Sequence, residues 1–374
     1  MPRERRANCT RHRPASRRLP GLLAIALTSL ATQLTACSHE DLDQPEPIDV
    51  SLVWGEVGSS PGQFTYPRAM AVIPGDEPRL LIVDKTARIQ LFNAATGEFL
   101  GGFRTPELDL GKPTGLCVAP HPTDSSRYAL YVADTHYFRV LVYELPDAIG
   151  DDPSIPREPF ATFGSYGTDN GQFIYPTDVA VLHDEQGHVQ RIYVGEYNGN
   201  DRVSVFDVST GADGKPVFTF SFAIARAGVP GEDPEPVVRR PQTLIIDHKS
   251  RELLLTDACD HRIGRFTLDG KLIKWIGSPD TASRAPGTFK FPYGMALLDD
   301  RTVLVSEFEN ARVQQIDLET GECLGVWGRP GRGEGELSRP WAVEVIGKTA
   351  FVLDSDNDRV MAFRAPAPAA EAAR

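Results

Sequence analysis

One short pattern recurs six times along this chain, and this repetition constrains the possible folds more than any other feature of the sequence. In each copy an apolar, β-rich run ends in Asp or Glu, and a short polar turn follows. Arg comes next, then a branched apolar residue, two variable positions and a bulky apolar residue. The six pairs of acid and arginine are Asp84 and Arg88, Asp134 and Arg139, Glu196 and Arg202, Asp257 and Arg262, Glu307 and Arg312, and Asp354 and Arg359. Internal repeats with a period of tens of residues indicate stacked copies of one supersecondary unit.

A proline stands upstream of each copy and opens a further short apolar run. Because proline has no N–H to donate, it is tolerated at the first residue of a strand. Short apolar runs bounded by Gly, Asn and Asp are strand-sized, and no stretch has the length and periodicity of an amphipathic helix. Each unit is therefore expected to form four consecutive strands joined by turns. The six prolines are Pro67, Pro113, Pro176, Pro241, Pro292 and Pro340.

Six such units predict an all-β fold, a six-bladed β-propeller with four-stranded antiparallel blades, because radial repetition leaves only short sheet edges exposed. Five outermost strands can be recognised, and the last repeat ends at Arg364 without one. The missing copy lies at the N-terminal end, where Leu-Val-Trp-Gly at 52–55 matches Gly-Val-Trp-Gly at 325–328. We therefore expect residues 51–54 to pair with the last blade around 360–363 and to close the ring. The five recognisable outermost strands are Phe99–Phe103, Phe160–Gly164, Phe218–Phe222, Leu272–Gly277 and Cys323–Gly328.

The whole pattern, from proline through the acid to the arginine that leads the third strand, resembles the NHL repeat across residues 51–364. Glu196 and Glu307 stand where that repeat usually has Asp. Since the acid and the arginine occur once in every unit, we expect them to stabilise each turn between second and third strands through charge-assisted hydrogen bonds.

The first 36 residues differ from the rest of the chain. Seven arginines and a charge-free apolar stretch precede small residues, as in a secretory signal. Leu-Thr-Ala-Cys at 34–37 resembles a bacterial lipobox, which implies a lipid on Cys37 and removal of residues 1–36. Residues 37–50 are then expected to form a flexible tether, and the Ala/Pro-rich residues 365–374 a disordered tail. This arrangement predicts a lipid-anchored protein of the bacterial cell envelope, at the outer membrane or the periplasmic face.

The charge balance bears on the partners. Residues 1–36 hold seven of the 39 Lys and Arg and one of the 51 Asp and Glu, so their removal changes the net charge from −12 to −18. Such a surface repels phosphate backbones, which makes nucleic acid a poor partner. Three further cysteines, Cys117, Cys259 and Cys323, allow one disulfide at most.

A metal-dependent enzyme is the alternative function that the resemblance raises. Some NHL-like propellers are zinc lyases that act on peptidyl-hydroxyglycine, which implies several His ligands, but only His136 and His261 occupy equivalent turns here. A catalytic zinc site generally has three protein ligands. Gluconolactonase-type propellers bind a divalent cation through Glu, Asn and Asp, and Glu196, Asn198 and Asp178 lie in one repeat. Nothing fixes their mutual geometry, so no metal ligand is assigned, and no cofactor is expected.

A binding surface is the function that the sequence favours. In a propeller, the loops that enter the innermost strands and the turns between second and third strands share one face, here named the loop face. Aromatic and arginine side chains recur there, and such residues are enriched at binding hot spots. We expect a monomeric, non-enzymatic recognition or scaffold protein that binds an envelope protein, peptide or glycan on this face. Packing within the repeats is the alternative role for the aromatic residues. The candidate ligand-binding residues are Tyr66, Arg68, His136, Tyr175, Arg240, Tyr293 and Trp341.

Overall fold

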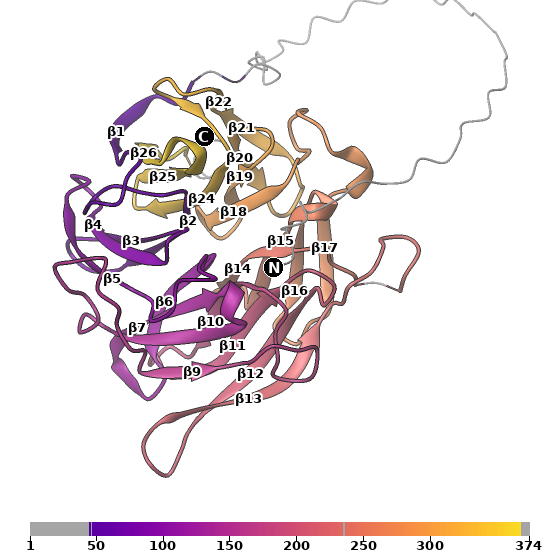
Figure 1. Ribbon diagram of the computed structural model, residues 1–374. Helices are drawn as coiled ribbons and strands as arrows, with labels where there is room; N and C mark the ends of the chain where they lie inside the picture. The colour runs from indigo at the N-terminus through magenta and orange to yellow at the C-terminus, as the bar shows by residue number, and fades with distance from the viewer. Residues whose placement is uncertain (1–44, 46, 235, 368–374) are drawn as a thin grey trace, which may run out of the picture. The chain divides into compact units, whose positions relative to one another are not determined.

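The computed structural model describes residues 45, 47–234 and 236–367 (Figure 1). The predicted signal segment, Cys37, most of the predicted tether and the tail after Ala367 lie outside the described residues. In the part of the chain that the structure describes, no helix is long and apolar enough to cross a membrane.

Six four-stranded antiparallel sheets surround a central channel, so the predicted six-bladed propeller is confirmed (Figure 1). The innermost strand of each blade contacts the innermost strands of the two neighbouring blades, which completes the ring. From the channel outward the strands are β2 (Pro67–Ile73), β3 (Arg79–Asp84), β4 (Arg88–Asn93) and β5 (Phe99–Arg104) in blade 1; β6 (Gly115–His121), β7 (Asp124–Asp134), β8 (Arg139–Leu145) and β9 (Ala161–Phe163) in blade 2; β10 (Pro176–His183), β11 (Val189–Glu196), β12 (Arg202–Thr210) and β13 (Pro216–Ile224) in blade 3; β14 (Pro241–Asp247), β15 (Glu252–Asp257), β16 (Arg262–Thr267) and β17 (Leu272–Gly277) in blade 4; β18 (Pro292–Leu297), β19 (Thr302–Glu307), β20 (Arg312–Asp317) and β21 (Cys323–Trp327) in blade 5; and β24 (Pro340–Ile346), β25 (Thr349–Asp354), β26 (Arg359–Arg364) and β1 (Val50–Trp54) in blade 6.

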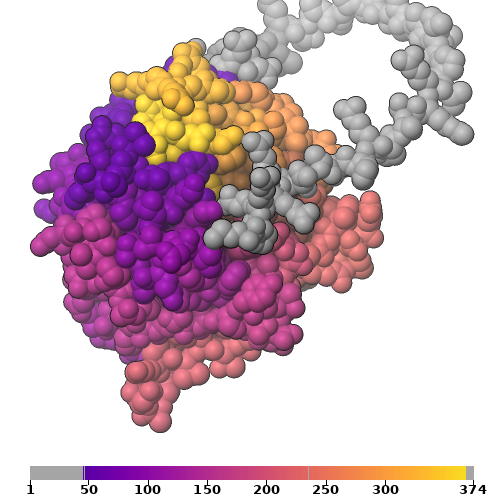
Figure 2. All heavy atoms as spheres, in the orientation of Figure 1, coloured from indigo at the N-terminus to yellow at the C-terminus, as the bar shows by residue number. Residues whose placement is uncertain are grey.

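Short elements complete the connections. The turns from second to third strands contain single-turn 3₁₀ helices in blades 2, 4 and 6, and a further one follows β17. The hairpin between β12 and β13 projects from blade 3 and forms the lowest part of the molecule in Figure 2. The 3₁₀ helices are η1 (Thr135–Tyr137), η2 (Ala258–Asp260), η3 (Pro279–Thr281) and η4 (Ser355–Asn357), and the short strands β22 (Arg329–Pro330) and β23 (Glu336–Leu337) pair with each other.

The hydrophobic core lies between adjacent blades. The second strands are apolar without alternation because each of their faces is covered by a neighbouring blade. Leu81 and Val83 of blade 1, for example, pack in one cluster with Leu130 and Val132 of blade 2. Both pairs are completely buried.

The acid and the arginine of each repeat form an ion pair in all six blades, so the predicted charge-assisted pairing is confirmed. The acids are fully buried, and the shortest N–O distances run from 2.5 Å for Arg312 and Glu307 to 2.9 Å for Arg359 and Asp354. In five blades the guanidinium group also donates to backbone carbonyls of the preceding interblade loop; Arg359, for instance, lies 2.9 Å from the Glu336 carbonyl oxygen. In blade 2, Arg139 instead donates to the Glu107 side chain of that loop. Each pair therefore joins a turn to the loop that leads into its own blade.

Strand β1 closes the ring as predicted. It pairs antiparallel with β26, with Val53 opposite Met361 and Trp54 opposite Val360. The Trp54 ring packs against Phe351 of blade 6 at 6.0 Å between centroids. The packed chain begins earlier than the predicted tether boundary at residue 50, because Ile48 is 4% exposed and its N–H donates to the Gly335 carbonyl at 2.9 Å.

The outer edge of blade 1 is covered by the long connection between β8 and β9. Gly102 of β5 exchanges backbone hydrogen bonds with Gly150, and Arg104 does the same with Ile155 and Arg157. The segment 150–157 therefore takes the place of a fifth strand. Covering an edge in this way removes a row of unpaired backbone groups that could pair with another chain.

Candidate functional site

The turns of the loop face begin with an unusual backbone conformation. The residue before the strand-opening proline has a positive φ in five blades, at Tyr66 (54°), Tyr175 (144°), Arg240 (72°), Phe291 (54°) and Arg339 (50°). A residue with a side chain costs of order 1 kcal/mol in this region unless its surroundings hold it there.

Three of these residues are held by a side chain of the preceding blade. The Tyr66 N–H donates to Asp358 Oδ1 at 2.6 Å, and the Arg240 N–H donates to Asp201 Oδ1 at 2.7 Å. The Phe291 N–H donates to His261 Nδ1 at 3.1 Å. We name these contacts interblade clamps. The acceptors share one sequence position, directly before the repeat arginine, and this signal was not recognised from the sequence. The other three blades have Ala87, Phe138 and Ala311 at that position.

The candidate ligand-binding residues meet in one connected network, which we name the mouth arc. In blades 2 to 4, His136 contacts Tyr175 at 5.3 Å between ring centroids, and Tyr175 contacts Tyr197 at 5.5 Å. The Arg240 guanidinium lies 4.7 Å from the centre of the Tyr197 ring and 4.8 Å from that of Tyr293. Tyr197, absent from the predicted set, thus connects blade 3 to blade 4.

The mouth arc continues through blades 5, 6 and 1. The rings of Tyr293 and Trp341 lie 5.0 Å apart, and Trp341 meets Tyr66 edge-on at 5.8 Å. The Arg68 guanidinium lies 5.1 Å from the centre of the Trp341 ring. The structure therefore brings all seven predicted residues together around the channel mouth.

Two of the seven are buried, which fits packing within the repeats, the alternative role expected for the aromatic residues. Tyr293 is 4% and Trp341 is 7% exposed, whereas the other five are partly exposed. Each is the unpaired residue where the strand register shifts, between Pro292 and Gly294 in β18 and between Pro340 and Ala342 in β24. A register shift of this kind changes the direction in which a side chain points. Here both rings pack with Ala258 in a small apolar cluster. Ligand binding by the mouth arc remains a prediction.

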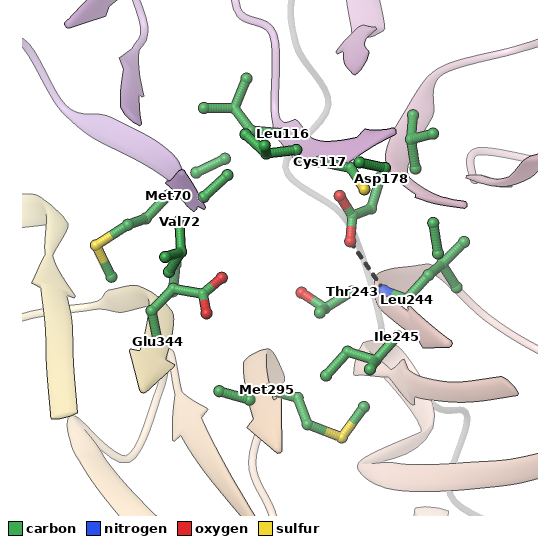
Figure 3. A pocket seen from close by; sticks show the side chains of 18 of the residues that line it. Met70, Val72, Leu116, Cys117, Asp178, Thr243, Leu244, Ile245, Met295 and Glu344 are labelled. Carbon is green, nitrogen blue, oxygen red and sulfur yellow. Dashed lines mark hydrogen bonds between the residues drawn. The ribbon is translucent and has the colours of Figure 1, made fainter. Parts of the chain in front are cut away.

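Beneath the mouth lies a cavity of about 540 Å³ enclosed by the six innermost strands (Figure 3). Two carboxyl groups point into it, from Asp178 of β10 and Glu344 of β24, together with the Cys117 thiol of β6. Blades 3 and 6 are three positions apart in the ring, so the carboxyl groups approach the channel from opposite sides. The surrounding wall is mostly apolar and includes Met70, Val72, Leu116, Leu244, Ile245 and Met295.

The surroundings of the two carboxyl groups raise their pKa. Asp178 is 8% exposed, and its Oδ2 accepts the Leu244 N–H at 2.9 Å. Burial nevertheless raises the pKa of Asp178 to about 7. Burial, followed by the nearby Asp178, raises the pKa of Glu344 to about 8. Burial and both carboxyl groups also raise the pKa of Cys117, so its thiol stays protonated and is a poor nucleophile.

The residues considered for metal binding do not converge. His261 accepts the Phe291 N–H in a clamp, and His136 packs on Tyr175 in a different blade. Glu196 Oε1 accepts from Arg202 and Ser204, whereas Asp178 faces the channel. No group of three or more His, Cys, Asp or Glu side chains within the described ranges is arranged to hold a metal ion.

Comparisons with known proteins support the fold. No protein-family model matches the sequence. NHL repeat-containing protein 2 of Gallus gallus is 27% identical over 131 residues, which cover 31% of this chain and 18% of that protein. A structural-genomics protein of unknown function from Bacteroides thetaiotaomicron superposes with a TM-score of 0.60 and 16% identity over 84% of this chain and 75% of that chain. The hydrazine synthase structure of Kuenenia stuttgartiensis gives a TM-score of 0.50 and 13% identity over 83% and 97%, respectively.

Proposed function

We propose that this six-bladed β-propeller, whose repeats resemble the NHL repeat, is a recognition protein that binds a protein, peptide or glycan at the mouth arc, without catalysing a reaction. The observation that carries this proposal is the continuity of the arc. Aromatic and arginine side chains from every blade contact one another in sequence around the channel mouth.

The buried and exposed parts of the arc have complementary roles in this proposal. Tyr293 and Trp341 are held by packing, and Tyr66, Tyr175 and Arg240 stack against them or against their neighbours. Side chains already fixed by stacking lose little further freedom when a ligand binds. Aromatic rings also supply a large contact area with few rotatable bonds.

The partner and the location form part of the same proposal. A net charge of −18 after loss of residues 1–36 favours protein, peptide or glycan over nucleic acid. The lipobox-like residues 34–37 support anchoring through Cys37 in the cell envelope. We propose that the propeller acts there as a monomer.

Paired substitutions on the two faces test the binding function. We expect Tyr175→Ala with Arg240→Ala to weaken binding of array-selected peptides or glycans by at least about tenfold, the loss of two interface anchors. Arg79→Ala with Arg251→Ala removes two arginines from the opposite face, neither of which lines the channel, and should leave binding unchanged. Dissociation constants and melting temperatures should be measured for both double variants. Equal binding by the mouth variant and the parent would refute the proposed site.

A further inference from the structure

We propose that the channel beneath the mouth binds a primary ammonium group at the end of an unbranched aliphatic chain, such as the lysine side chain of a docked peptide. This inference deepens the proposed function and rests on it in one respect, namely that the peptide itself lies on the mouth arc. The ammonium group would sit between Asp178 and Glu344, on opposite sides of the channel (Figure 3).

No cation of the described part of the chain compensates the two carboxyl groups. Among the described residues that line the channel, Arg68 at the mouth and His183 at the far end are the only basic side chains, and none is Lys. Neither Arg68 nor His183 lowers the pKa of Asp178 or Glu344. Burial raises the pKa of both carboxyl groups, and the nearby Asp178 raises that of Glu344 further. A bound ammonium group would supply the opposite charge that favours ionised carboxylates.

The apolar lining of the channel favours an aliphatic chain next to the ammonium group. Met70, Val72, Leu116, Ile245 and Met295 offer apolar contact around the carboxyl groups. Unbranched methylene groups fit such a wall, whereas a hydrated divalent ion needs six or more oxygen ligands. A cavity of about 540 Å³ is of the size that small ligands occupy.

A second, independent observation points to a ligand that also carries a carbonyl group. Trp341 lines the same channel, is 7% exposed, and its indole Nε1 has no hydrogen-bond acceptor in the part of the chain that the structure describes. Buried donors without an acceptor are rare in proteins. Trp341 and Glu344 are three residues apart on β24, roughly 10 Å at about 3.3 Å per residue. In a peptide, the backbone carbonyl of a lysine residue and the ammonium group of its extended side chain are separated by a similar length. One lysine residue could therefore contact both Trp341 and Glu344.

Three small probes separate the parts of this proposal in calorimetric titrations of the full chain. N-acetyl-lysine N-methylamide carries both groups, N-acetyl-norleucine N-methylamide lacks the ammonium group, and n-butylamine lacks the carbonyl. We expect the lysine derivative to bind at least about tenfold more tightly than either of the others, one such contact being worth about that factor. Equal binding of the norleucine derivative would overturn the ammonium site. Equal binding of n-butylamine would overturn the peptide as its source.

Isosteric variants test the two carboxyl groups directly. Asp178→Asn and Glu344→Gln should each weaken binding of the lysine derivative at least about tenfold, because each removes one ionisable partner. Glu232→Gln, at an exposed position away from the channel, should not. Both channel variants should fold, since an amide resembles the neutral acid, and melting curves check this. Unchanged affinity in both folded variants would overturn the proposal.

Proton release provides a further readout. With the pKa of Asp178 near 7 and that of Glu344 near 8, ammonium binding must displace protons. Affinity should therefore rise with pH between 6 and 8, by up to about tenfold per unit for one proton released. The buried Cys117 thiol, Arg68, Tyr128 and His183 are the other titratable groups among the described residues that line the channel. A flat profile across this range would contradict the site.

The mouth variant distinguishes this inference from the proposed function. Neither Tyr175 nor Arg240 lines the channel, so Tyr175→Ala with Arg240→Ala should leave binding of the small lysine derivative within about twofold of the parent. If the mouth variant binds both the lysine derivative and the selected peptides or glycans as the parent does, the mouth arc is not the binding site, and the channel site is unaffected. Loss of lysine binding in the folded mouth variant would overturn a separate channel site.

Discussion

At the scale of single residues, the mouth depends on side chains that occupy one position of the repeat. Asp358, Asp201 and His261 each directly precede the repeat arginine and accept a backbone N–H of the next blade. These bonds hold the strand-entry residue at a positive φ, and with it the side chains of the mouth arc. Ala311 has nearly the same backbone conformation as Asp358 without a clamp, so the position itself tolerates alanine.

Substitution of Asp358 measures one clamp. We expect Asp358→Ala to lower the free energy of unfolding by about 1–2 kcal/mol, because the Tyr66 N–H loses its acceptor. Asp358→Asn keeps an acceptor oxygen and tolerates the left-handed conformation, so its loss should be less than half as large. Urea unfolding of the two variants checks this, and equal losses would show that the hydrogen bond is not the cause.

At the scale of elements, strand β1 determines whether the ring is closed. It supplies the outermost strand of blade 6 and buries Trp54 against Phe351 and Phe92 of the two blades that meet there. Ile48 adds a buried side chain beside blades 5 and 6.

Deleting residues 47–54 should therefore destabilise the propeller. We expect the free energy of unfolding to fall by several kcal/mol, because the burial of Ile48 and Trp54 is lost and β26, the third strand of blade 6, becomes an open edge. The melting temperature should fall by roughly 10 °C. Truncation after Ala367 keeps its carbonyl contact with Gln315 and should change the melting temperature little. Similar shifts for the two deletions, measured by circular dichroism, would show that β1 has no special part in closure.

The sequence predicts elements well where the repeat fixes both ends of a strand. Proline begins most innermost strands, the acid ends every second strand and arginine begins every third, so those bounds agree with the structure. The predicted outermost strand Leu272–Gly277 is also matched in full, whereas Phe218–Phe222 is extended at both ends to Pro216–Ile224. Outermost strands carry no such markers, and their length follows from the hairpin that each connection can form.

The sequence predicts contacts less well where an irregular step or a long connection decides them. The burial of Tyr293 and Trp341 follows from a register shift that no residue type announces. The segment 150–157 reads as a polar loop, and only its hydrogen bonds to Gly102 and Arg104 make it part of blade 1. The sequence groups Asp178 with Glu196, its neighbour in the repeat, whereas the ring places Asp178 across the channel from Glu344, 166 residues away in sequence.

At the scale of the whole molecule, the proposed anchor decides where the propeller is found. A double acyl chain on Cys37 should hold the protein stably in a membrane. In bacteria that produce the full chain, we expect most of the parent to sediment with membranes and Cys37→Ala to move to the soluble fraction. Cys323→Ala removes a thiol of the propeller and should stay with the membranes. Unchanged sedimentation of Cys37→Ala, judged by immunoblotting, would rule out this anchor.

Ring closure by β1 also places both ends of the described propeller in one blade. Strand β26 starts beside the mouth, at the turn that holds Asp358, and β1 runs antiparallel to it. The chain leaves β26 on the far side, where the Ala365 N–H donates to the Lys348 carbonyl in the turn before β25. A force that pulls on either end of the propeller would therefore act first on the pairing of β1 with β26, which is the contact that closes the ring.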